Sequence, residues 1–491
     1  MRSYGRSMAE LDAIVVGSGP NGLAAAVTLA RAGLSVRVYE REATIGGGSR
    51  TAELTLPGFS HDVCSAVHPL ALASGFFRRF GLERRIELVV PELSFGHPLD
   101  GGRAALAWRD LDRTVDGLGR DGAAYRRLME PLVDRADQVA QFVLSSLLQV
   151  PRHPVTAVRF GLRALEQASA AAGARFHDDA APALLAGVGA HAIQRMPSLA
   201  AAGTALSLTT YAHARGWPIP IGGSRRIVEA LADDLRAHGG EILTSTEVRS
   251  LAELPSARAI LADTTPRALS VLAADRLPDT YGRRLRRFRY GAGAAKVDFA
   301  LSGPVPWANA DLARAGTVHV GGTSAEIARS EAEVAAGRHP DDPYVLVAQP
   351  SVDDATRAPA GAHVLWAYTH VPAGSTLDPT EAVTRRIERF APGFRDVVLA
   401  AHARTAVDLE AENPNYVGGD IAGGAPTFRQ LLARPVLSTD PWRTPADGLY
   451  LCSSSTAPGP GVHGLSGYYA ARSALRHEFG ILSPPSLAPE R

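Results

Sequence analysis

Residues 13–40 read AIVVGSGPNGLAAAVTLARAGLSVRVYE, and this stretch decides the fold class. The apolar run Ala13–Val16 is typical of a buried parallel strand. A glycine-rich turn leads into Gly22–Ala32, whose alanines and leucines favour a helix that ends before Gly33. Ser35–Tyr39 then has the pattern of a second strand. The stretch therefore predicts a strand, a tight turn, a helix and a parallel strand.

The turn between the first strand and the helix has the spacing G-x-G-x-x-G. Its first glycine permits the turn, its second lets a diphosphate approach the backbone, and its third lets helix and strand pack closely. The helix N-terminus offers N–H groups and a positive dipole end to the same diphosphate. An acidic residue at the end of the second strand can accept hydrogen bonds from ribose hydroxyls. The unit predicts a dinucleotide site formed by Gly17, Gly19, Pro20, Asn21, Gly22, Glu40 and Arg41.

Length and composition exclude several classes of protein. With 491 residues, the chain is expected to form two or three compact units. The net charge of +1 gives no electrostatic footprint for nucleic acid, so no nucleic-acid partner is expected. Cys64 and Cys452 form no C-x-x-C pair, which argues against a redox dithiol or a disulfide scaffold. The richness in Ala, Gly, Pro and Arg is typical of a GC-rich bacterial genome.

The sequence predicts a cytoplasmic protein. Residues 1–12, MRSYGRSMAELD, lack the apolar core of a signal peptide. No run of about 18 apolar residues supports a membrane-spanning helix. Peripheral contact with a membrane surface and assembly into a homodimer both remain compatible with the sequence.

A second glycine cluster, GGGSRT, follows at residues 46–51. It resembles the GG doublet of FAD-dependent amine oxidases and phytoene-type desaturases. The resemblance implies that Gly47, Gly48 and Ser49 pass close to FAD and that Arg50 reaches the cofactor phosphates. An NAD dehydrogenase has no need of this second cluster. The alternative is a plain surface turn with a solvated arginine.

Residues 448–475 read GLYLCSSSTAPGPGVHGLSGYYAARSAL. They resemble the C-terminal flavin motif of the phytoene desaturase and carotenoid isomerase family. The resemblance implies a helix that begins near Leu465 and points its N-terminus at the flavin, where reduction builds negative charge. Ser453–Thr456 departs from the family pattern, which has a GxGT-like sequence there. The cofactor residues implied by the motif are Ser455, Gly461, Val462 and His463.

Other segments resemble the same family. GGEILTSTEV at residues 239–248 resembles its returning nucleotide-side unit, in which the backbone of Val248 would meet the adenine end. ILADTTPR at 260–267 stands where relatives have a strand and an xDxTPR-like turn. NPNYVGGDIAGG at 413–424 resembles the branch of pyridine nucleotide-disulphide oxidoreductase domain-containing proteins.

We expect an α/β fold with a Rossmann-like, amine-oxidase-like FAD-binding domain and an inserted substrate domain of antiparallel sheet plus helices. Helical spacing continues from about residue 71 to 215, which predicts a mostly helical insertion. Strand-like runs near 297–301, 344–348 and 363–368 lack intervening helices, which predicts an antiparallel sheet. The expected FAD-binding domain comprises residues 9–70, 217–290 and 410–480, and the expected substrate-binding domain comprises residues 71–216 and 291–409.

Two residues are candidates for catalysis. Lys296 precedes a predicted strand, and flavin amine oxidases place a lysine at a similar strand start; the alternative is an ordinary surface lysine. His463 lies within the flavin motif, although buried structural histidines are commoner than catalytic ones. His61 and His68 do not have H-x₃-H or HExxH spacing, so no metal site is expected.

The resemblance implies an FAD-dependent oxidoreductase that removes hydride from a hydrophobic substrate of isoprenoid, polyene or lipid-like character. Oxygen, a quinone or NAD(P) would accept the electrons. A flavin amine oxidase is a weaker alternative, since Tyr468 and Tyr469 are the only paired aromatics near the motif and both fall in a predicted helix. A flavin-holding regulatory or interaction protein without turnover is a further alternative.

Overall fold

The computed structural model describes residues 11–489, and its first element is the predicted strand–turn–helix–strand unit. The helix runs from Pro20 to Ala30 rather than from Gly22 to Ala32, because proline suits the first helical position. Residues 1–10 lie outside the described part, and with them most of the segment on which the localisation prediction rests. None of the helices in residues 11–489 is long and apolar enough to cross a membrane.

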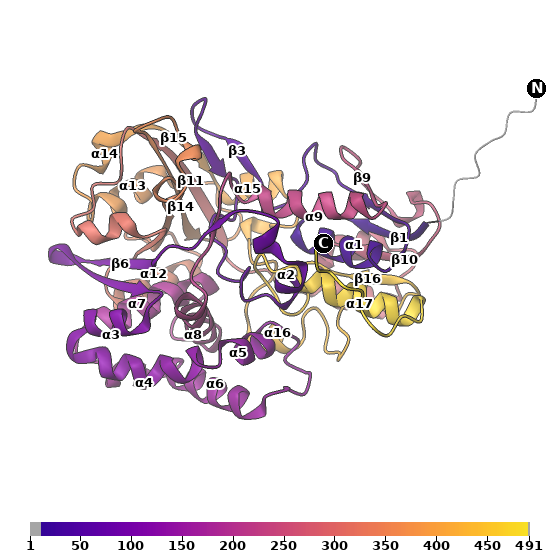
Figure 1. The fold of residues 1–491 in the computed structure, drawn as a ribbon, viewed down its shortest axis with the longest axis horizontal. Coiled ribbons are helices and arrows are strands. Elements are labelled where there is room, and N and C mark those ends of the chain that lie inside the picture. Colours follow the sequence, from indigo (N-terminus) through magenta and orange to yellow (C-terminus); the bar gives the residue numbers. More distant parts are fainter. Residues whose placement is uncertain (1–10, 490–491) are drawn as a thin grey trace, which may run out of the picture.

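A parallel five-stranded sheet forms the right-hand part of Figure 1. Helices α1, α9 and α17 pack on one face of this sheet, and α10 and α11 pack on the other. The strands lie in the order β16 (Leu449–Leu451), β10 (Ala257–Ala262), β1 (Leu11–Val16), β2 (Val36–Tyr39) and β9 (Glu241–Leu243). The helices are α1 (Pro20–Ala30), α9 (Arg225–Ala237), α10 (Pro266–Leu272), α11 (Asp279–Arg286) and α17 (Leu465–Glu478).

A seven-stranded, largely antiparallel sheet forms the upper left of Figure 1. Residues 93–108, expected to be part of a mostly helical segment, form a hairpin that joins this sheet. Gly96, His97 and Pro98 interrupt the alternation that is typical of a strand, so the sequence does not predict the hairpin. The order is β15 (Val398–Arg404), β11 (Gly293–Leu301), β14 (His363–Val371), β13 (Val345–Ala348), β12 (Thr317–Val320), β6 (Leu93–Leu99) and β7 (Arg103–Trp108).

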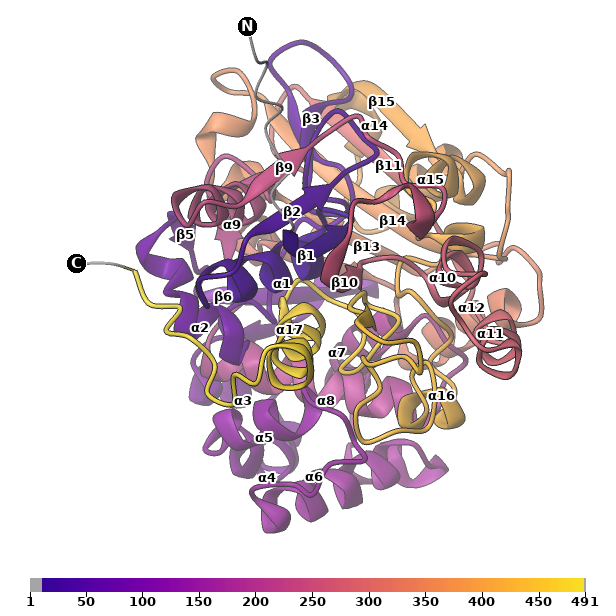
Figure 2. The ribbon, with the colours of Figure 1, turned by 90° about the vertical axis from the view of Figure 1, so that its right-hand side faces the viewer.

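The helical part expected between residues 71 and 215 is present and lies at the bottom of both views (Figures 1 and 2). Residues 122–143 of this part form two helices with a break at residues 134–135. The helices are α3 (Leu111–Gly117), α4 (Gly122–Val133), α5 (Ala136–Val143), α6 (Pro154–Gln167), α7 (Ala180–Gly189) and α8 (Leu199–Ala214).

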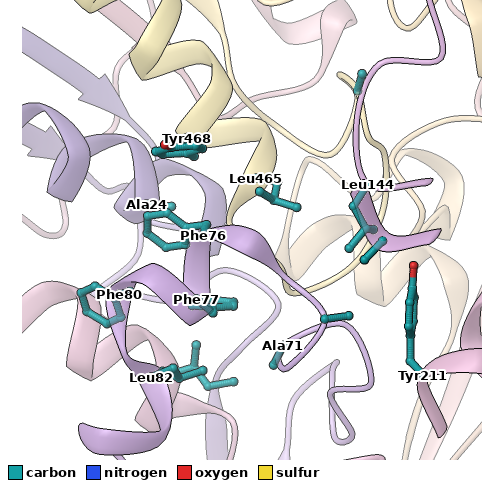
Figure 3. Packing of buried hydrophobic residues seen from close by; sticks show 14 of the residues in the cluster. Ala24, Ala71, Phe76, Phe77, Phe80, Leu82, Leu144, Tyr211, Leu465 and Tyr468 are labelled. Atoms are coloured by element: carbon teal, nitrogen blue, oxygen red, sulfur yellow. The ribbon is translucent and has the colours of Figure 1, made fainter. Parts of the chain in front are cut away.

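A shared apolar core joins the helical part to the five-stranded sheet. The short helix α2 (Gly75–Phe80) places Phe76 against Tyr468 of α17, with ring centroids 5.8 Å apart, and beside Ala24 of α1 (Figure 3). Phe76 and Phe80 stack at 5.9 Å. These rings are buried and closely packed, so they hold the helical part against the five-stranded sheet.

Candidate cofactor and substrate site

One continuous cavity of about 1180 Å³ lies between the two sheets and the helical part. Its lining combines the glycine loop after β1, the ends of β2 and β10, and residues of β13, β14, α5, α6 and α8. Cavities that hold small ligands usually measure about 300–1,000 Å³. The cavity is therefore larger than the usual site of a single small ligand.

The glycine loop has the geometry that its sequence predicts. Gly17 has φ +100°, a backbone conformation that side chains rarely adopt. A Cβ at Gly22 would lie 2.2 Å from the carbonyl oxygen of Gly17. Gly17, Gly19, Pro20 and Asn21 line the cavity, whereas Gly22 turns its N–H to the Asp263 carboxylate at 2.9 Å.

Glu40 lies at the end of β2 and lines the cavity beside Arg41. Its Oε2 accepts from the backbone N–H of Ser18 at 2.9 Å, and its Oε1 accepts from the N–H of Glu42 at 2.9 Å. These bonds fix the carboxylate at the cavity edge. The Arg41 guanidinium pairs with Glu42 at 2.6 Å.

The second glycine cluster lies against the first. A Cβ at Gly47 would be 3.2 Å from the Cα of Gly19. The Ser49 hydroxyl and the Oδ1 of Asn21 are buried and have no hydrogen-bond partner among residues 11–489. Buried polar groups nearly always have a partner, and both residues belong to the cavity lining, so a polar ligand in the cavity is the partner that they lack. Gly47, Gly48, Ser49 and Arg50 all line the cavity, as does Val248.

The C-terminal motif forms the part of the wall beside the glycine loop, where the Asn21 side-chain amide is 3.4 Å from the Ser454 hydroxyl. Ser455, Gly461 and Val462 line the cavity. The helix α17 begins at Leu465, where the sequence predicts it. A Cβ at Gly467 would lie 1.8 Å from the carbonyl oxygen of Asn21, so only glycine lets α17 approach α1 this closely.

His463 has a structural environment rather than a catalytic one. Its Nε2 pairs with the carbonyl of Gly459 at 3.1 Å, and its Nδ1 accepts from the N–H of Leu465 at 3.0 Å. The side chain is fully buried and is not part of the cavity lining. Burial lowers its pKa to about 4, which keeps the ring neutral. The prediction that His463 contacts the cofactor or acts in catalysis therefore has no geometric support.

Lys296 is the only lysine in the sequence, and it is buried on β11 with 2% exposure. Its Nζ pairs with Asp298, and it lies 5.5 Å from the ring centroid of Trp366. Trp366 lines the cavity, whereas Lys296 does not. Burial lowers the pKa of Lys296 from 10.5 to about 8. Lys296 is thus one side-chain layer behind the cavity wall, and the surface-lysine alternative is wrong.

Asp263, at the end of β10, is a site residue that the sequence reasoning did not single out. Its Oδ2 accepts from Gly22, and Asn415 donates to its backbone carbonyl at 3.1 Å. Burial raises the pKa of Asp263 to about 7. The ILADTTPR segment was recognised by its strand and turn, but only the folded chain brings this carboxyl group to the glycine loop.

Each of the two histidines that follow the second glycine cluster makes one polar contact with a neighbouring hydroxyl. His61 Nε2 contacts the Thr55 hydroxyl at 2.8 Å, and His68 Nε2 contacts the Ser224 hydroxyl at 2.8 Å. Burial lowers the pKa of each imidazole to about 4. Both rings are therefore neutral at physiological pH.

The far end of the cavity is mostly apolar. Trp366 and Tyr368 of β14 face it, with ring centroids 5.2 Å apart and planes at 78°. Tyr468 and Tyr469, the pair noted in the sequence, do not line the cavity. The remaining apolar lining includes Phe142, Val143, Leu144, Phe160, Ala164, Leu199, Leu208 and Leu346.

These features define a Rossmann-like nucleotide-binding fold with a second, largely antiparallel sheet. A model of the NAD(P)-binding Rossmann-like domain matches residues 15–80. The pyridine nucleotide-disulfide oxidoreductase domain-containing protein 2 of Rattus norvegicus is 27% identical over 95% of this chain and 94% of its own. The 4,4'-diapolycopen-4-al dehydrogenase of Metabacillus indicus is 32% identical over 25% of this chain and 26% of its own.

Among solved structures, a triple mutant of putrescine oxidase is similar with a TM-score of 0.60 and 17% identity, covering 96% of this chain and 99% of that chain. At this identity the likeness concerns the fold alone. The three relatives are named as an oxidoreductase-domain protein, a dehydrogenase and an oxidase. Because they include a mammalian and a bacterial protein, they do not fix the source of this chain.

Proposed function

We propose that this protein is an FAD-dependent oxidoreductase that removes hydride from a largely apolar substrate of isoprenoid, polyene or lipid-like character. The observation that carries the proposal is the continuity of one cavity from the glycine loop and Glu40 to the apolar residues of α5, α6 and α8. A nucleotide cofactor and an apolar molecule can thus meet in one cavity. The local similarity to a diapolycopenal dehydrogenase supports a phytoene desaturase-like substrate class.

When bound, FAD supplies the ring that accepts hydride, and the protein supplies binding and orientation. Glu40 would accept from the ribose, and the N-terminus of α1 with Gly17 and Gly19 would hold the diphosphate. Asn21 Oδ1 and the Ser49 hydroxyl, both lacking partners in the described chain, would gain hydrogen bonds from the cofactor. The reaction also requires an electron acceptor, for which oxygen, a quinone and NAD(P) are the candidates.

Lys296 enters the proposal as a positioning residue. Because it does not reach the cavity, it would act through Asp298 and the Trp366 ring, which it helps to hold in place. With a pKa near 8, its ammonium group remains mostly charged at pH 7 and places a positive charge close to the wall of the cavity. Its replacement by methionine should slow flavin reduction or reoxidation while leaving flavin content unchanged.

An amine oxidase is the weaker second candidate, although an aromatic pair lines the cavity. An aromatic cage for an amine needs two rings with a gap between them. Trp366 and Tyr368 instead contact each other edge to face at 5.2 Å, which leaves no gap for an amine. This geometry favours the apolar substrate. A flavin-holding protein without turnover is the alternative of a different class.

The experiment that separates these functions begins with the flavin content of the purified protein. Candidate isoprenoids, fatty compounds and amines are then added under anaerobic conditions, and loss of the oxidised flavin absorption band is followed. Mass spectrometry of apolar molecules that purify with the protein supplies the first compounds to test. Bleaching by an amine alone favours the second candidate. A flavin that no added compound bleaches, in a protein that binds a partner protein tightly, favours the non-catalytic alternative.

A further inference from the structure

The helix α6 carries an apolar stripe on its outer face. Val155, Val158, Leu162 and Leu165 recur at spacings of three and four residues and are 72%, 61%, 62% and 59% exposed. Val150, in the loop before the helix, is 91% exposed. Single exposed apolar side chains are ordinary, whereas a row of them on one helix marks an interaction surface. These five residues are called the apolar stripe below.

The opposite face of the same helix borders the cavity. Phe160 and Ala164 are buried, and both line the cavity together with Gly161. Leu147, in the loop between α5 and α6, lines the cavity and is also 37% exposed. The thickness of one helix therefore separates the apolar stripe from the space proposed for the substrate, and the loop beside it reaches both.

The charge around the apolar stripe is positive. Residues 144–165 contain no Asp or Glu but include Arg152, Arg159 and Arg163. Arg152 and Arg159 have no ion-pair partner in the described part of the chain. Glu166, which follows this segment, pairs with Arg163 at 3.0 Å. An apolar helix face flanked by unpaired arginines is typical of helices that lie in the interface of anionic membranes.

The position of α6 suits contact with a flat surface. The helix lies at the lower edge of the molecule in both views (Figures 1 and 2). A second copy of the chain is the competing occupant. In a two-fold dimer through this face, the unpaired Arg152 and Arg159 of one copy would lie near those of the other. That like-charge contact disfavours the dimer, whereas anionic headgroups would neutralise the same arginines.

We propose that the apolar stripe docks on the surface of an anionic phospholipid bilayer and that an apolar substrate enters the cavity from the lipid beside Leu147. Docking on a bilayer is a property separate from the proposed redox function. Its test does not depend on flavin chemistry, because vesicle binding is measured on the protein itself.

The test is cosedimentation of the full chain with vesicles of phosphatidylcholine alone or of phosphatidylcholine with phosphatidylserine. The wild-type protein should sediment with the anionic vesicles and bind them less in high salt, because salt screens the arginines. Val158→Glu with Leu162→Glu should reduce the partition coefficient by about tenfold per side chain. Leu399→Glu is the matched control, since Leu399 is 53% exposed but lies on β15 at the opposite end.

A second pair of changes separates charge from apolar contact. Arg152→Gln with Arg159→Gln should weaken binding to the anionic vesicles by about fivefold per arginine and leave the neutral vesicles unaffected. Circular dichroism establishes that each variant is folded. The proposal is overturned if the wild-type protein binds no vesicles or if the stripe variant binds as well as Leu399→Glu. A dimer that dissociates in the stripe variant would also overturn it, in favour of a second copy.

Discussion

The ionisation of Lys296 tests the electrostatics of the site directly. Because Lys296 is the only lysine in the sequence, protein grown with isotope-labelled lysine gives one side-chain NMR signal. The side chain is 2% exposed and lies beside Asp298, whose other oxygen is 3.4 Å from Arg404. Burial lowers the pKa of Lys296 from 10.5 to about 8, because the ammonium group loses its water and the neighbouring carboxylate only partly compensates.

The two pKa values of Lys296 set the size and the sign of its effect on the free energy of unfolding. The difference between 10.5 and about 8 corresponds to about 3 kcal/mol, since each pH unit is worth about 1.4 kcal/mol. Between these two pH values the unfolded lysine keeps its proton while the folded one releases it. The unfolded state therefore binds more protons, and the free energy of unfolding rises with pH across this window. Below pH 8 the cost of burying the charged form of Lys296 is present in full.

The assay is an NMR titration of the labelled lysine in the folded protein and again in denaturant. The folded midpoint should lie near pH 8 and the denatured midpoint near the ordinary lysine value. A denaturant series comparing wild type with Lys296→Met gives an independent measure, since all other titrating groups are common to both. The stability of wild type relative to the variant should increase as pH rises above 8. A folded midpoint near 10.5 would refute the reasoning, because it would show a hydrated ammonium group.

Three further changes test the cofactor end of the cavity. Glu40→Ala should reduce FAD retention by the loss of one or two charge-assisted hydrogen bonds, about 1.5–3 kcal/mol each, and normal flavin occupancy would contradict the ribose assignment. Because burial raises the pKa of Asp263 to about 7, wild type should lose stability relative to Asp263→Asn as pH rises from 4 to 7; denaturation at several pH values measures this, and a constant difference would count against it. Gly467→Ala should lower the melting temperature by several degrees, since the added Cβ would meet the carbonyl of Asn21 at 1.8 Å; Gly117→Ala, with open space around it, is the control, and equal melting temperatures would contradict the close packing.

Local patterns predicted the elements that carry their own signals. The strand–turn–helix–strand unit and the start of α17 at Leu465 can be predicted from the sequence, because turn glycines, apolar runs and helix spacing are all short-range features. The hairpin at residues 93–108 has no such signal, because its buried strand contains glycine, histidine and proline and lacks the alternation of apolar and polar residues.

Long-range packing decided the roles of individual side chains. The sequence allows Lys296 to be either a surface residue or a catalytic residue. Only its pairing with the neighbouring strands places it in the interior behind Trp366. His463 stood inside the flavin motif, but the fold of its own loop occupies both ring nitrogens. Asp263 and Gly22 are 241 residues apart in the sequence, so no local pattern predicts the hydrogen bond between them.

The sequence by itself determined that this protein has a dinucleotide-binding strand–turn–helix unit, since the glycine spacing and a glutamate at the end of the second strand are local requirements of that site. It also determined the chemical character of the second glycine cluster and the C-terminal motif. The tertiary structure alone decided that these segments border one cavity with an apolar far end, and that α6 has one face toward that cavity and one toward solvent. The reason is physical: backbone geometry is encoded within a few residues, whereas burial and side-chain partners depend on segments brought together from the whole chain.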